Sequence, residues 1–587
     1  MREELRRSSE GGFSSPAGVH GALCVVRGSV RMGKERRRLV CVCCGLVVAV
    51  VAVLLIIVCV VRSKCPGERF SHAAVAADSL RCSNIGRDML LEGGSVVDAA
   101  ISALLCTALV NPQSMGLGGG AIFTIMDKSG KVKVISSRET VPKSFTQDLL
   151  KRCPKSLQLT TGQEWIGVPG ELRGYASAHK MYGKLPWARL FEPIIKMARD
   201  GFPMPVYLAK FLQHQFMKPV VEKSSLCQVF CHKNKTVLGV GDTLRYPKLA
   251  ETLEIIAKQG AEAFYTGQVA QDLIQDVQEA GGQLSLEDLE SFKVRVDEAS
   301  TVSLGEYEMH IPPLPAGGAI ISLILNIMHG FGLSPASLQG NQTALTLHRY
   351  IEAAKFANGQ RRNIKDPHYN HQNVDYMMES SFADQVRAMI NDHSTHPTSF
   401  YNITPSSDRF GTTHVSVLAA DGSAVSVTST INHIFGSFVY SPRTGIILNN
   451  ELADFCGRAD SISAGEQPPS SMAPTILQSK DRKKILVIGG SGGSMITTAI
   501  AQSVMNRVWL GKSLKDSISE KVVFVDGQNT VNFEPGFQQS LIEEMRTRGH
   551  SIKNRDFFLN VVNAVEKEHG CICAFSDERK NGKAAGY

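Results

Sequence analysis

A threonine-rich β-hairpin over residues 411–432 is the feature of this sequence that most constrains its fold. The dipeptide Asp421-Gly422 lies between two runs of alternating apolar and small polar residues, and it is a strong signal for a two-residue type I′ turn. A turn of that length fixes the strand register and places Thr412 opposite Ile431. The sequence therefore predicts an antiparallel pair whose first strand opens on a threonine.

In this register Thr430 and Asn432 lie one residue to either side of the position that faces Thr412, and they share one strand face. A threonine at such a place becomes an N-terminal nucleophile if the chain is cut just before it. The preceding residues, 391–410, have the composition of an exposed loop, where chains are often cut. A cut between Gly411 and Thr412 would therefore make Thr412 an N-terminal nucleophile; the structural alternative is a generic threonine-rich hairpin.

The N-terminal region predicts a membrane anchor. Residues 39–61 form an unbroken apolar run, and about 20 such residues suffice to cross a bilayer. Basic residues at 36–38 precede the run, so the positive-inside rule places the tail 1–38 in the cytosol and the chain after Arg62 outside. The basic excess lies in this tail, which argues against nucleic acid as a partner. We expect a single-pass type II protein of the plasma membrane with an extracellular ectodomain.

Three glycosylation sequons and four of the cysteines fit an oxidising, secretory compartment. The sequons begin at Asn234, Asn341 and Asn402. The cysteines form two plausible disulfide pairs, Cys65 with Cys82 and Cys227 with Cys231. A zinc site needs four ligands, and only His232 accompanies the second pair, so we expect no metal and no other cofactor.

Two helices stand out in the rest of the chain. Residues 95–110 read as a helix with Ser95 as N-cap, and residues 343–358 as another, with Gly359 just beyond its end. The glycine run 116–120 precedes a strand-like segment, the reverse of the order in a dinucleotide-binding motif.

A second glycine-rich run, residues 489–494, lies between a buried strand and a helix, so its backbone N–H groups can bind negative charge. One interpretation is the Gly489-x-Ser491-x-Gly493 nucleophile elbow of a serine α/β-hydrolase. The partners that such an enzyme needs follow in order: Asp516, Asp526, His550 and His569. The other interpretation is an oxyanion hole formed by the N–H groups of Gly492 and Gly493. The elbow gives the threonine hairpin no role.

Glu451 and Asp454 are three residues apart and share one face of a helical turn. Two neighbouring carboxylates suit a cationic amine, whereas the structural alternative is a solvated acidic turn.

Together these segments resemble the γ-glutamyltransferase family over nearly the whole ectodomain. The stretches that carry the resemblance are residues 72–78, 111–120, 137–140, 168–175, 412–432, 445–454, 470–472, 489–493 and 584–587. Residues 111–118 and 165–170 are most similar to the type 5, leukotriene C4-hydrolysing branch. Phe202-Pro203 and the Cys-x3-Cys pair look equally like the glutathione-cleaving type 1 branch.

The resemblance implies an α+β fold, the αββα sandwich of N-terminal nucleophile hydrolases. It also implies autocleavage at Gly411–Thr412, which would give a large subunit, 62–411, and a small catalytic subunit, 412–587, that stay together as a heterodimer. The chain would cleave the γ-glutamyl bond of glutathione, glutathione S-conjugates and leukotriene C4, and pass the γ-glutamyl group to water or to an amino-acid or dipeptide acceptor.

The resemblance also assigns roles within the site. The catalytic set is Thr412 as nucleophile, Thr430 as its orienting partner, and Gly492 and Gly493 as oxyanion hole. The substrate-binding set is Arg138, Ser470 and Ser471 for the donor α-carboxylate, with Asn432, Glu451 and Asp454 for its α-ammonium. Two rivals belong to other classes: a serine α/β-hydrolase that uses Ser491, and an unprocessed surface protein that only binds ligands.

Overall fold

The structure is a computed structural model that describes Val51 and residues 69–153, 162–403, 411–554 and 561–587. The predicted cytosolic tail, the predicted anchor apart from Val51, and Cys65 fall outside these residues. Within the described part of the chain, no helix is both long and apolar enough to cross a membrane.

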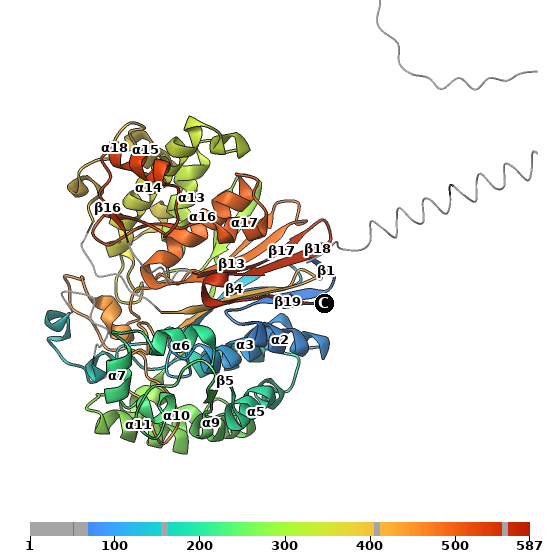
Figure 1. The fold of residues 1–587 in the computed structure, drawn as a ribbon, viewed down its shortest axis with the longest axis vertical. Coiled ribbons are helices and arrows are strands. Elements are labelled where there is room, and N and C mark those ends of the chain that lie inside the picture. Colours follow the sequence, from blue (N-terminus) through green and yellow to red (C-terminus); the bar gives the residue numbers. More distant parts are fainter. Residues whose placement is uncertain (1–50, 52–68, 154–161, 404–410, 555–560) are drawn as a thin grey trace, which may run out of the picture. The chain divides into compact units, whose positions relative to one another are not determined.

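Two seven-stranded antiparallel sheets are stacked face to face in the unit Cys65–Tyr587 (Figure 1). Sheet I has the order β1 (Arg69–Phe70), β18 (Cys571–Ser576), β17 (Val561–Glu568), β13 (Ile485–Ser491), β12 (Thr475–Ser479), β9 (Tyr307–Ile311) and β8 (Ser300–Leu304). Sheet II has the order β19 (Ala585–Gly586), β2 (Ala73–Ala76), β10 (Thr413–Ala419), β11 (Ala424–Thr430), β3 (Gly120–Met126), β4 (Val132–Ser136) and β7 (Arg295–Glu298). The central strands of both sheets are buried on both faces, which explains their apolar and hydroxyl-rich sequences.

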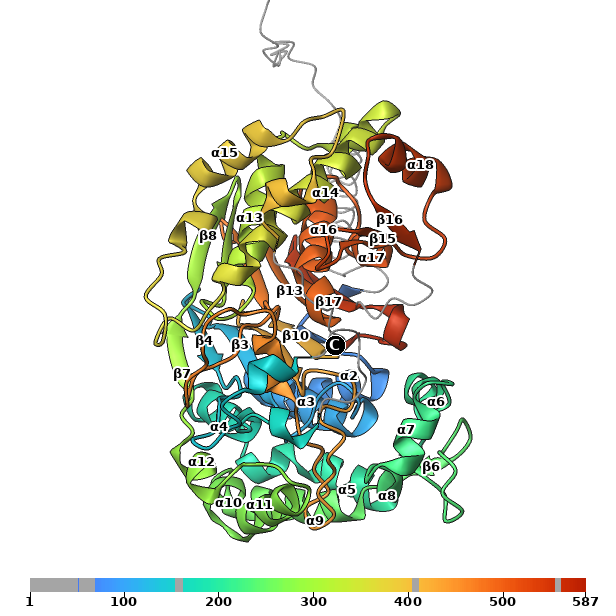
Figure 2. The ribbon, with the colours of Figure 1, turned by 90° about the vertical axis from the view of Figure 1, so that its left-hand side faces the viewer.

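Helices cover the outer face of each sheet, so the layers run α, β, β, α (Figures 1 and 2). On the side of sheet II the helices are α2 (Leu80–Leu91), α3 (Val96–Val110), α4 (Glu171–Tyr182), α5 (Glu192–Asp200), α6 (Val206–Leu212), α7 (Lys218–Lys223), α8 (Cys227–Phe230), α9 (Pro247–Gln259), α10 (Ala263–Thr266), α11 (Gln268–Glu279) and α12 (Leu286–Ser291). On the side of sheet I they are α13 (Gly318–His329), α14 (Asn341–Gln360), α15 (Ser380–Met389), α16 (Ile496–Val508), α17 (Leu514–Ser519) and α18 (Gln539–Thr547). Two small sheets complete the unit: β5 (Phe202–Pro203) with β6 (Thr243–Leu244), and β14 (Val523–Val525), β15 (Val531–Phe533) and β16 (Ile552–Asn554).

The core has one apolar layer between the sheets and one beneath each helical layer. Between the sheets, hydroxyl side chains bond across to backbone carbonyls of the other layer: Ser426 Oγ donates to Ile488 O at 3.0 Å and Ser416 Oγ to Asn563 O at 3.1 Å. These bonds satisfy buried polar groups and fix β10 and β11 against sheet I.

The predicted hairpin is present, but its register is wrong by one residue. Ala419 N donates to Ser423 O at 3.0 Å, which makes a three-residue loop, and Thr413 pairs with Ser429. A type I′ turn needs positive φ at both central residues, whereas of Asp421 and Gly422 only Gly422 has it, at +91°. Thr430, rather than Ile431, is therefore the residue beside Thr412.

Both predicted helices are confirmed. Ser95 forms a capping box with Asp98 at the start of α3. The predicted helix end at Gly359 is wrong, because Gly359 lies inside α14. A Cβ at Gly359 would lie 1.9 Å from the carbonyl oxygen of Tyr401, so the glycine permits a close approach of two segments rather than a helix end.

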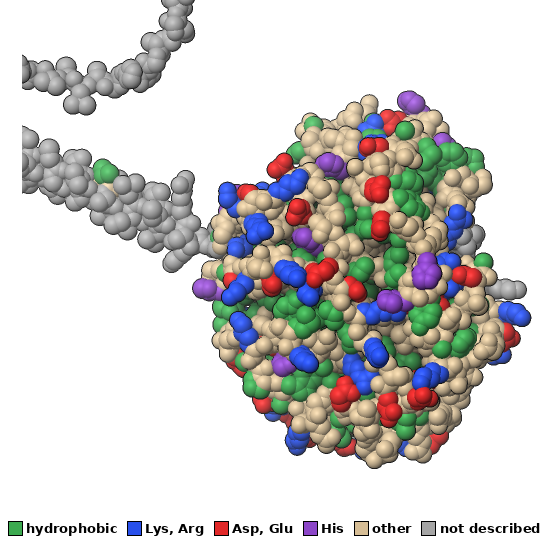
Figure 3. Space-filling view, turned by 180° about the vertical axis from the view of Figure 1, so that it is seen from behind, with side chains coloured by type: hydrophobic (Ala, Val, Ile, Leu, Met, Phe, Trp, Pro, Cys, Tyr) green, Lys and Arg blue, Asp and Glu red, His purple; other side chains and the backbone are tan. Residues whose placement is uncertain are grey.

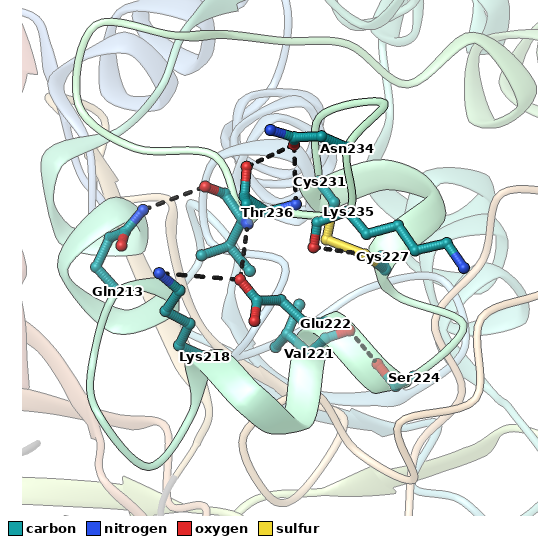
Figure 4. The surroundings of a disulfide bond; sticks show 11 residues. Gln213, Lys218, Val221, Glu222, Ser224, Cys227, Cys231, Asn234, Lys235 and Thr236 are labelled. Carbon is teal, nitrogen blue, oxygen red and sulfur yellow. Dashed lines mark hydrogen bonds and ion pairs between the residues drawn. A yellow bond between two sulfur atoms is a disulfide. The ribbon is translucent and has the colours of Figure 1, made fainter.

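The disulfides differ in part from the expectation. Cys227 and Cys231 are bonded, next to the exposed sequon residue Asn234 (Figure 4). The predicted pair of Cys82 with Cys65 is wrong: Cys82 on α2 is bonded to Cys106 on α3, because these two helices pack together with both cysteines fully buried. The two other sequon residues, Asn341 and Asn402, are also exposed. Their glycosylation stays a prediction.

Candidate active site

Thr412 directly precedes β10, and its buried side chain lies against Thr430 at the end of β11. Its hydroxyl is 3.0 Å from the hydroxyl of Thr430, and its N–H donates to Ser114 O at 3.1 Å. Its φ is +79°, a region that β-branched residues almost never adopt. The residue proposed as nucleophile is therefore held in a strained conformation directly after the proposed cut.

The carbonyl oxygen of Gly411 accepts a hydrogen bond from the N–H of Gly492 at 3.1 Å. Gly492 and Gly493 have φ of +116° and +60°, which turns the chain sharply between β13 and α16. A Cβ on Gly411 would lie 1.9 Å from the carbonyl oxygen of Asn432, so only glycine fits before Thr412. The second glycine-rich run thus presents an N–H donor to the carbonyl of the Gly411–Thr412 bond.

Thr430 links the hydroxyl of Thr412 to the loop that follows β11. Its Oγ1 accepts from the N–H of Asn432 at 2.8 Å, and the side-chain amide of Asn432 donates to Asn450 O at 3.1 Å. With the N–H bond fixing one lone pair, the Thr430 hydroxyl is oriented toward Thr412.

Arg138 lies with Glu451 and Asp454 in a buried ion cluster. Its guanidinium contacts Glu451, lies 2.6 Å from Asp454 Oδ2, and donates to the carbonyl oxygen of Pro469 at 2.9 Å. Burial alone lowers the pKa of Arg138, but the neighbouring carboxylates outweigh it and raise this pKa above its usual value. Burial, together with the charge of Glu451, raises the pKa of Glu139 well above its usual value. The cluster thus presents one cation and two carboxylates.

Ser470 and Ser471 lie beside this cluster. Ser471 Oγ accepts from Arg361 at 2.9 Å, and Ser470 N donates to Pro315 O at 2.8 Å. Arg361 also donates to Thr497 Oγ1 at 2.6 Å and therefore ties the serine pair to α16.

One cavity of about 590 Å³ brings these residues together. Nine of the ten predicted catalytic and substrate-binding residues line it: Thr412, Thr430, Gly493, Arg138, Asn432, Glu451, Asp454, Ser470 and Ser471. Gly492, the tenth, reaches the site through its bond to Gly411.

A buried network behind Thr412 was not predicted from the sequence. The ammonium of Lys580 donates to Thr412 O at 2.7 Å and to Asp78 Oδ2 at 2.9 Å, and Asn563 Nδ2 donates to the other oxygen of Asp78 at 2.7 Å. Thr413 Oγ1 donates to Asp78 as well, at 2.6 Å. Asp78, Asn563 and Lys580 are far from Thr412 in the sequence, so only the fold shows that they meet behind it.

Two further side chains support the site. Asn449 accepts from the N–H groups of Glu451 and Gly167, and its amide donates to Gly118 O at 2.7 Å. Glu171, at the start of α4, accepts from Ser429 Oγ at 2.7 Å, next to Thr430. Burial raises the pKa of Glu171 to about 8.

The serine α/β-hydrolase alternative is wrong. That fold needs its elbow on a parallel strand, but β13 is antiparallel to both of its neighbours. Ser491 is fully buried and accepts from Lys580 at 3.0 Å. His550 instead contacts His348 on α14, and the side chain of His569 is 79% exposed.

Two stacked antiparallel sheets with helices outside, and a threonine at the start of a central strand, define the fold of an N-terminal nucleophile hydrolase. Residues 82–587 match the family model described as Gamma-glutamyltranspeptidase, and the chain belongs to this family. It is accordingly an enzyme of the γ-glutamyltransferase type, which also excludes the alternative of a surface protein that only binds ligands.

Two relatives agree with this assignment, and one solved structure has the same fold. The chain is 48% identical to glutathione hydrolase 5 proenzyme of Rattus norvegicus, over 90% of this chain and 94% of the rat protein. It is 45% identical to the Homo sapiens protein of the same name, with the same coverage. The crystal structure of cephalosporin acylase from Bacillus halodurans has the same fold, with a TM-score of 0.79, 24% identity and coverage of 89% of this chain and 97% of that one.

Proposed function

We propose that the protein is a γ-glutamyl hydrolase and transferase that acts on glutathione, on glutathione S-conjugates and on leukotriene C4, which it converts to leukotriene D4. The observation that carries the proposal is the single cavity that combines a strained threonine with a charged cluster suited to a zwitterion. The relatives named glutathione hydrolase 5 support the choice of donors.

The same residues support self-cleavage between Gly411 and Thr412. The Thr412 hydroxyl attacks the Gly411 carbonyl, and the oxyanion forms where the Gly492 N–H already donates. The peptide bond becomes an ester as the Thr412 nitrogen leaves with a proton. This acyl shift already frees the Thr412 amine. Water then hydrolyses the ester, which restores the Thr412 hydroxyl, leaves a carboxylate on Gly411 and gives the large subunit 62–411 and the small subunit 412–587.

In turnover Thr412 Oγ attacks the γ-glutamyl carbonyl of the donor. Its own α-amine accepts the proton, directly or through water, because an α-amine has a pKa of about 7.7–8.0. The proton passes to the leaving amine of the cysteinyl residue, and a γ-glutamyl ester stays on Thr412. Attack by water gives glutamate, whereas the amine of an amino acid or dipeptide gives a transfer product.

The charged cluster recognises the γ-glutamyl end of the donor. Arg138 and the serine pair Ser470-Ser471 receive the α-carboxylate, since a guanidinium binds carboxylates with two parallel bonds. Glu451 and Asp454, together with Asn432, receive the α-ammonium. In the free enzyme Arg138 pairs with both carboxylates, which leaves one negative charge over, so donor binding exchanges these internal ion pairs for pairs with the donor.

Four further basic side chains line the cavity, which suits donors with an anionic far end. They are Arg361, Arg362, Lys365 and Arg458, of which Lys365 and Arg458 pair with Asp460. Glutathione and leukotriene C4 both carry a glycine carboxylate at the end opposite the γ-glutamyl group. On the face of the molecule in Figure 3, basic and acidic side chains are mixed.

We also propose that the protein is located in the plasma membrane. Residues 39–61 form its type II anchor, and the heterodimeric ectodomain lies outside the cell. Substrates from the extracellular fluid then reach the cavity without transport.

The test uses the full-length protein purified in detergent, with glutamate release measured from glutathione and leukotriene D4 formation measured from leukotriene C4. We expect wild type to turn over both donors and Thr412→Ala to turn over neither, because only the nucleophile is lost. Turnover by Thr412→Ala at the wild-type rate would contradict the proposal. A much larger kcat/KM for glutathione than for leukotriene C4 would contradict the leukotriene assignment and favour the type 1 preference.

A further inference from the structure

A disulfide connects the two sides of the proposed cut. Cys153 and Cys456 are bonded across 303 residues of sequence, and Gly411–Thr412 lies between them. The two other disulfides with described partners, Cys82–Cys106 and Cys227–Cys231, both lie within the large subunit. Cleavage therefore turns the Cys153–Cys456 bond from a loop closure into a link between two polypeptides.

The bond also lies at the substrate cavity. Cys456 lines the cavity and directly follows η8 (Glu451–Phe455), the short turn that carries Glu451 and Asp454. Cys153 directly follows another short turn, η1 (Leu149–Arg152). The disulfide therefore fixes the C-terminal ends of two isolated 3₁₀ turns. Turns this short are not stable without tertiary contacts.

A small apolar cluster surrounds the bond and is separate from the three layers of the core. It consists of Val141, Leu149, Trp165, Leu452, Ala453, Phe455 and Ile462, with the two cysteines packed against it. The large subunit supplies the first three members and the small subunit the other four. The position of η8 thus depends on a contact between subunits that the disulfide secures.

We propose that the Cys153–Cys456 disulfide covalently joins the two subunits of the mature enzyme and positions the turn that carries the carboxylates for the donor ammonium. The inference rests on the proposed cleavage at Gly411–Thr412. Cys153 and Cys456 are positioning residues, because they act through Glu451 and Asp454 rather than on the donor. Reduction takes two electrons and two protons from an added reductant and leaves two thiols, which frees the turn.

The first test is electrophoresis under denaturing conditions without reductant. Cys571 is disulfide-bonded as well, so the proteins carry Cys571→Ser, which removes any second link. We expect the cleaved Cys571→Ser protein to run as one species that splits into two on reduction. The double variant Cys571→Ser with Cys153→Ser should split into two species without reductant. The matched control, Cys571→Ser with Cys227→Ser, should not. Two species from unreduced Cys571→Ser would overturn the proposal.

Peptide mapping of unreduced wild type gives a readout that needs no variant and no activity. A linked pair of peptides containing Cys153 and Cys456 is expected, and both cysteines found as free thiols would overturn the inference. If the chain is uncut but the linked peptides are present, the proposed cleavage fails while the bond itself stands, so the two failures are distinguishable.

The positioning role is tested by kinetics with glutathione as donor. Loss of the bond should raise KM by about tenfold, which corresponds to ~1.4 kcal/mol of donor binding, and leave kcat close to wild type. Thr412 and the glycine loop do not depend on η8, so the chemical step is preserved. A KM for Cys153→Ser equal to that for Cys227→Ser would overturn this role.

Discussion

The backbone of Thr412, the proposed nucleophile, is strained. A positive φ at a β-branched residue costs on the order of 1–3 kcal/mol and persists only where the surroundings impose it. Here Ser114 holds the N–H of Thr412 and Lys580 holds its carbonyl. Because φ involves the preceding carbonyl carbon, cutting the bond to Gly411 releases this strain, which favours cleavage.

Replacing Thr430 by valine keeps the shape of the side chain and removes its hydroxyl. Thr412 Oγ then loses its partner at 3.0 Å and the N–H of Asn432 loses its acceptor. We expect the transition state to lose about 1–3 kcal/mol of stabilisation, which lowers the rates of cleavage and turnover roughly 5- to 160-fold. Cleavage is measured by the time course of small-subunit formation. Thr430→Ser, the control, should keep most of the rate, and equal rates for valine and wild type would contradict the role.

Replacing Lys580 by methionine leaves Asp78 as a buried charge without its cation. Breaking a buried ion pair in this way costs about 3–5 kcal/mol, so we expect a lower melting temperature and slow cleavage. The exposed Lys583 three residues later is the matched control, and Lys583→Met should resemble wild type.

A double variant separates stability from positioning at Lys580. Asp78→Asn with Lys580→Met removes both charges and should restore much of the melting temperature. Cleavage should stay slow, because Thr412 O still lacks its donor. Recovery of the wild-type cleavage rate in the double variant would limit Lys580 to a structural role.

The sequence predicted the residues of this site that occur in short motifs, such as Thr412, Gly492 and the pair Glu451 and Asp454. It could not predict Lys580 or Asp78, because no local pattern marks a lysine 168 residues from the threonine that it supports.

At the scale of elements, the site forms where the hairpin β10–β11 and the turn after β13 meet. The strands and helices here were predicted from alternation and capping residues, and the structure confirms them. The register was predicted wrongly, because the Asp421-Gly422 dipeptide suggested a type I′ turn, whereas Asp421 does not have the positive φ that this turn requires. The shift of the strand register by one residue places Thr430, rather than Ile431, beside Thr412.

The helix α4 adds a pH-dependent contribution to stability through Glu171. Its pKa is raised from 4.5 to about 8 in the folded protein, so between these pH values the folded state binds a proton that the unfolded state does not. The free energy of unfolding should therefore fall as pH rises through this window. Melting temperatures of wild type from pH 5 to 9 should fall more steeply than those of Glu171→Gln.

A matched control is Glu290→Gln, a change at an exposed glutamate on α12, which should melt in parallel with wild type. If Glu171→Gln also ran parallel to wild type, the carboxyl would be ionised in the folded protein and this assignment would fail.

At the scale of the whole molecule, the two proposed subunits share both sheets. In sheet II, β10 and β11 of the small subunit lie between β2 and β3 of the large one, and in sheet I β12 pairs with β9. This interleaving was not predicted, since pairing between strands hundreds of residues apart leaves no local signal in the sequence.

Shared sheets predict that the cut subunits stay together even when every disulfide is reduced. Size-exclusion chromatography of the cleaved protein in a reducing, non-denaturing buffer should give one peak that contains both polypeptides. Separate elution of the small subunit would mean that the covalent link, rather than the sheets, holds the molecule together.

The most direct test of the central claim, that a cut before Thr412 creates the nucleophile, is N-terminal sequencing of the smaller polypeptide from active, full-length protein. The account predicts the sequence Thr-Thr-His-Val-Ser, beginning at Thr412, and an intact chain for the Thr412→Ala variant. Active protein that consists only of the uncut chain, or a small polypeptide that begins at any other residue, would contradict it.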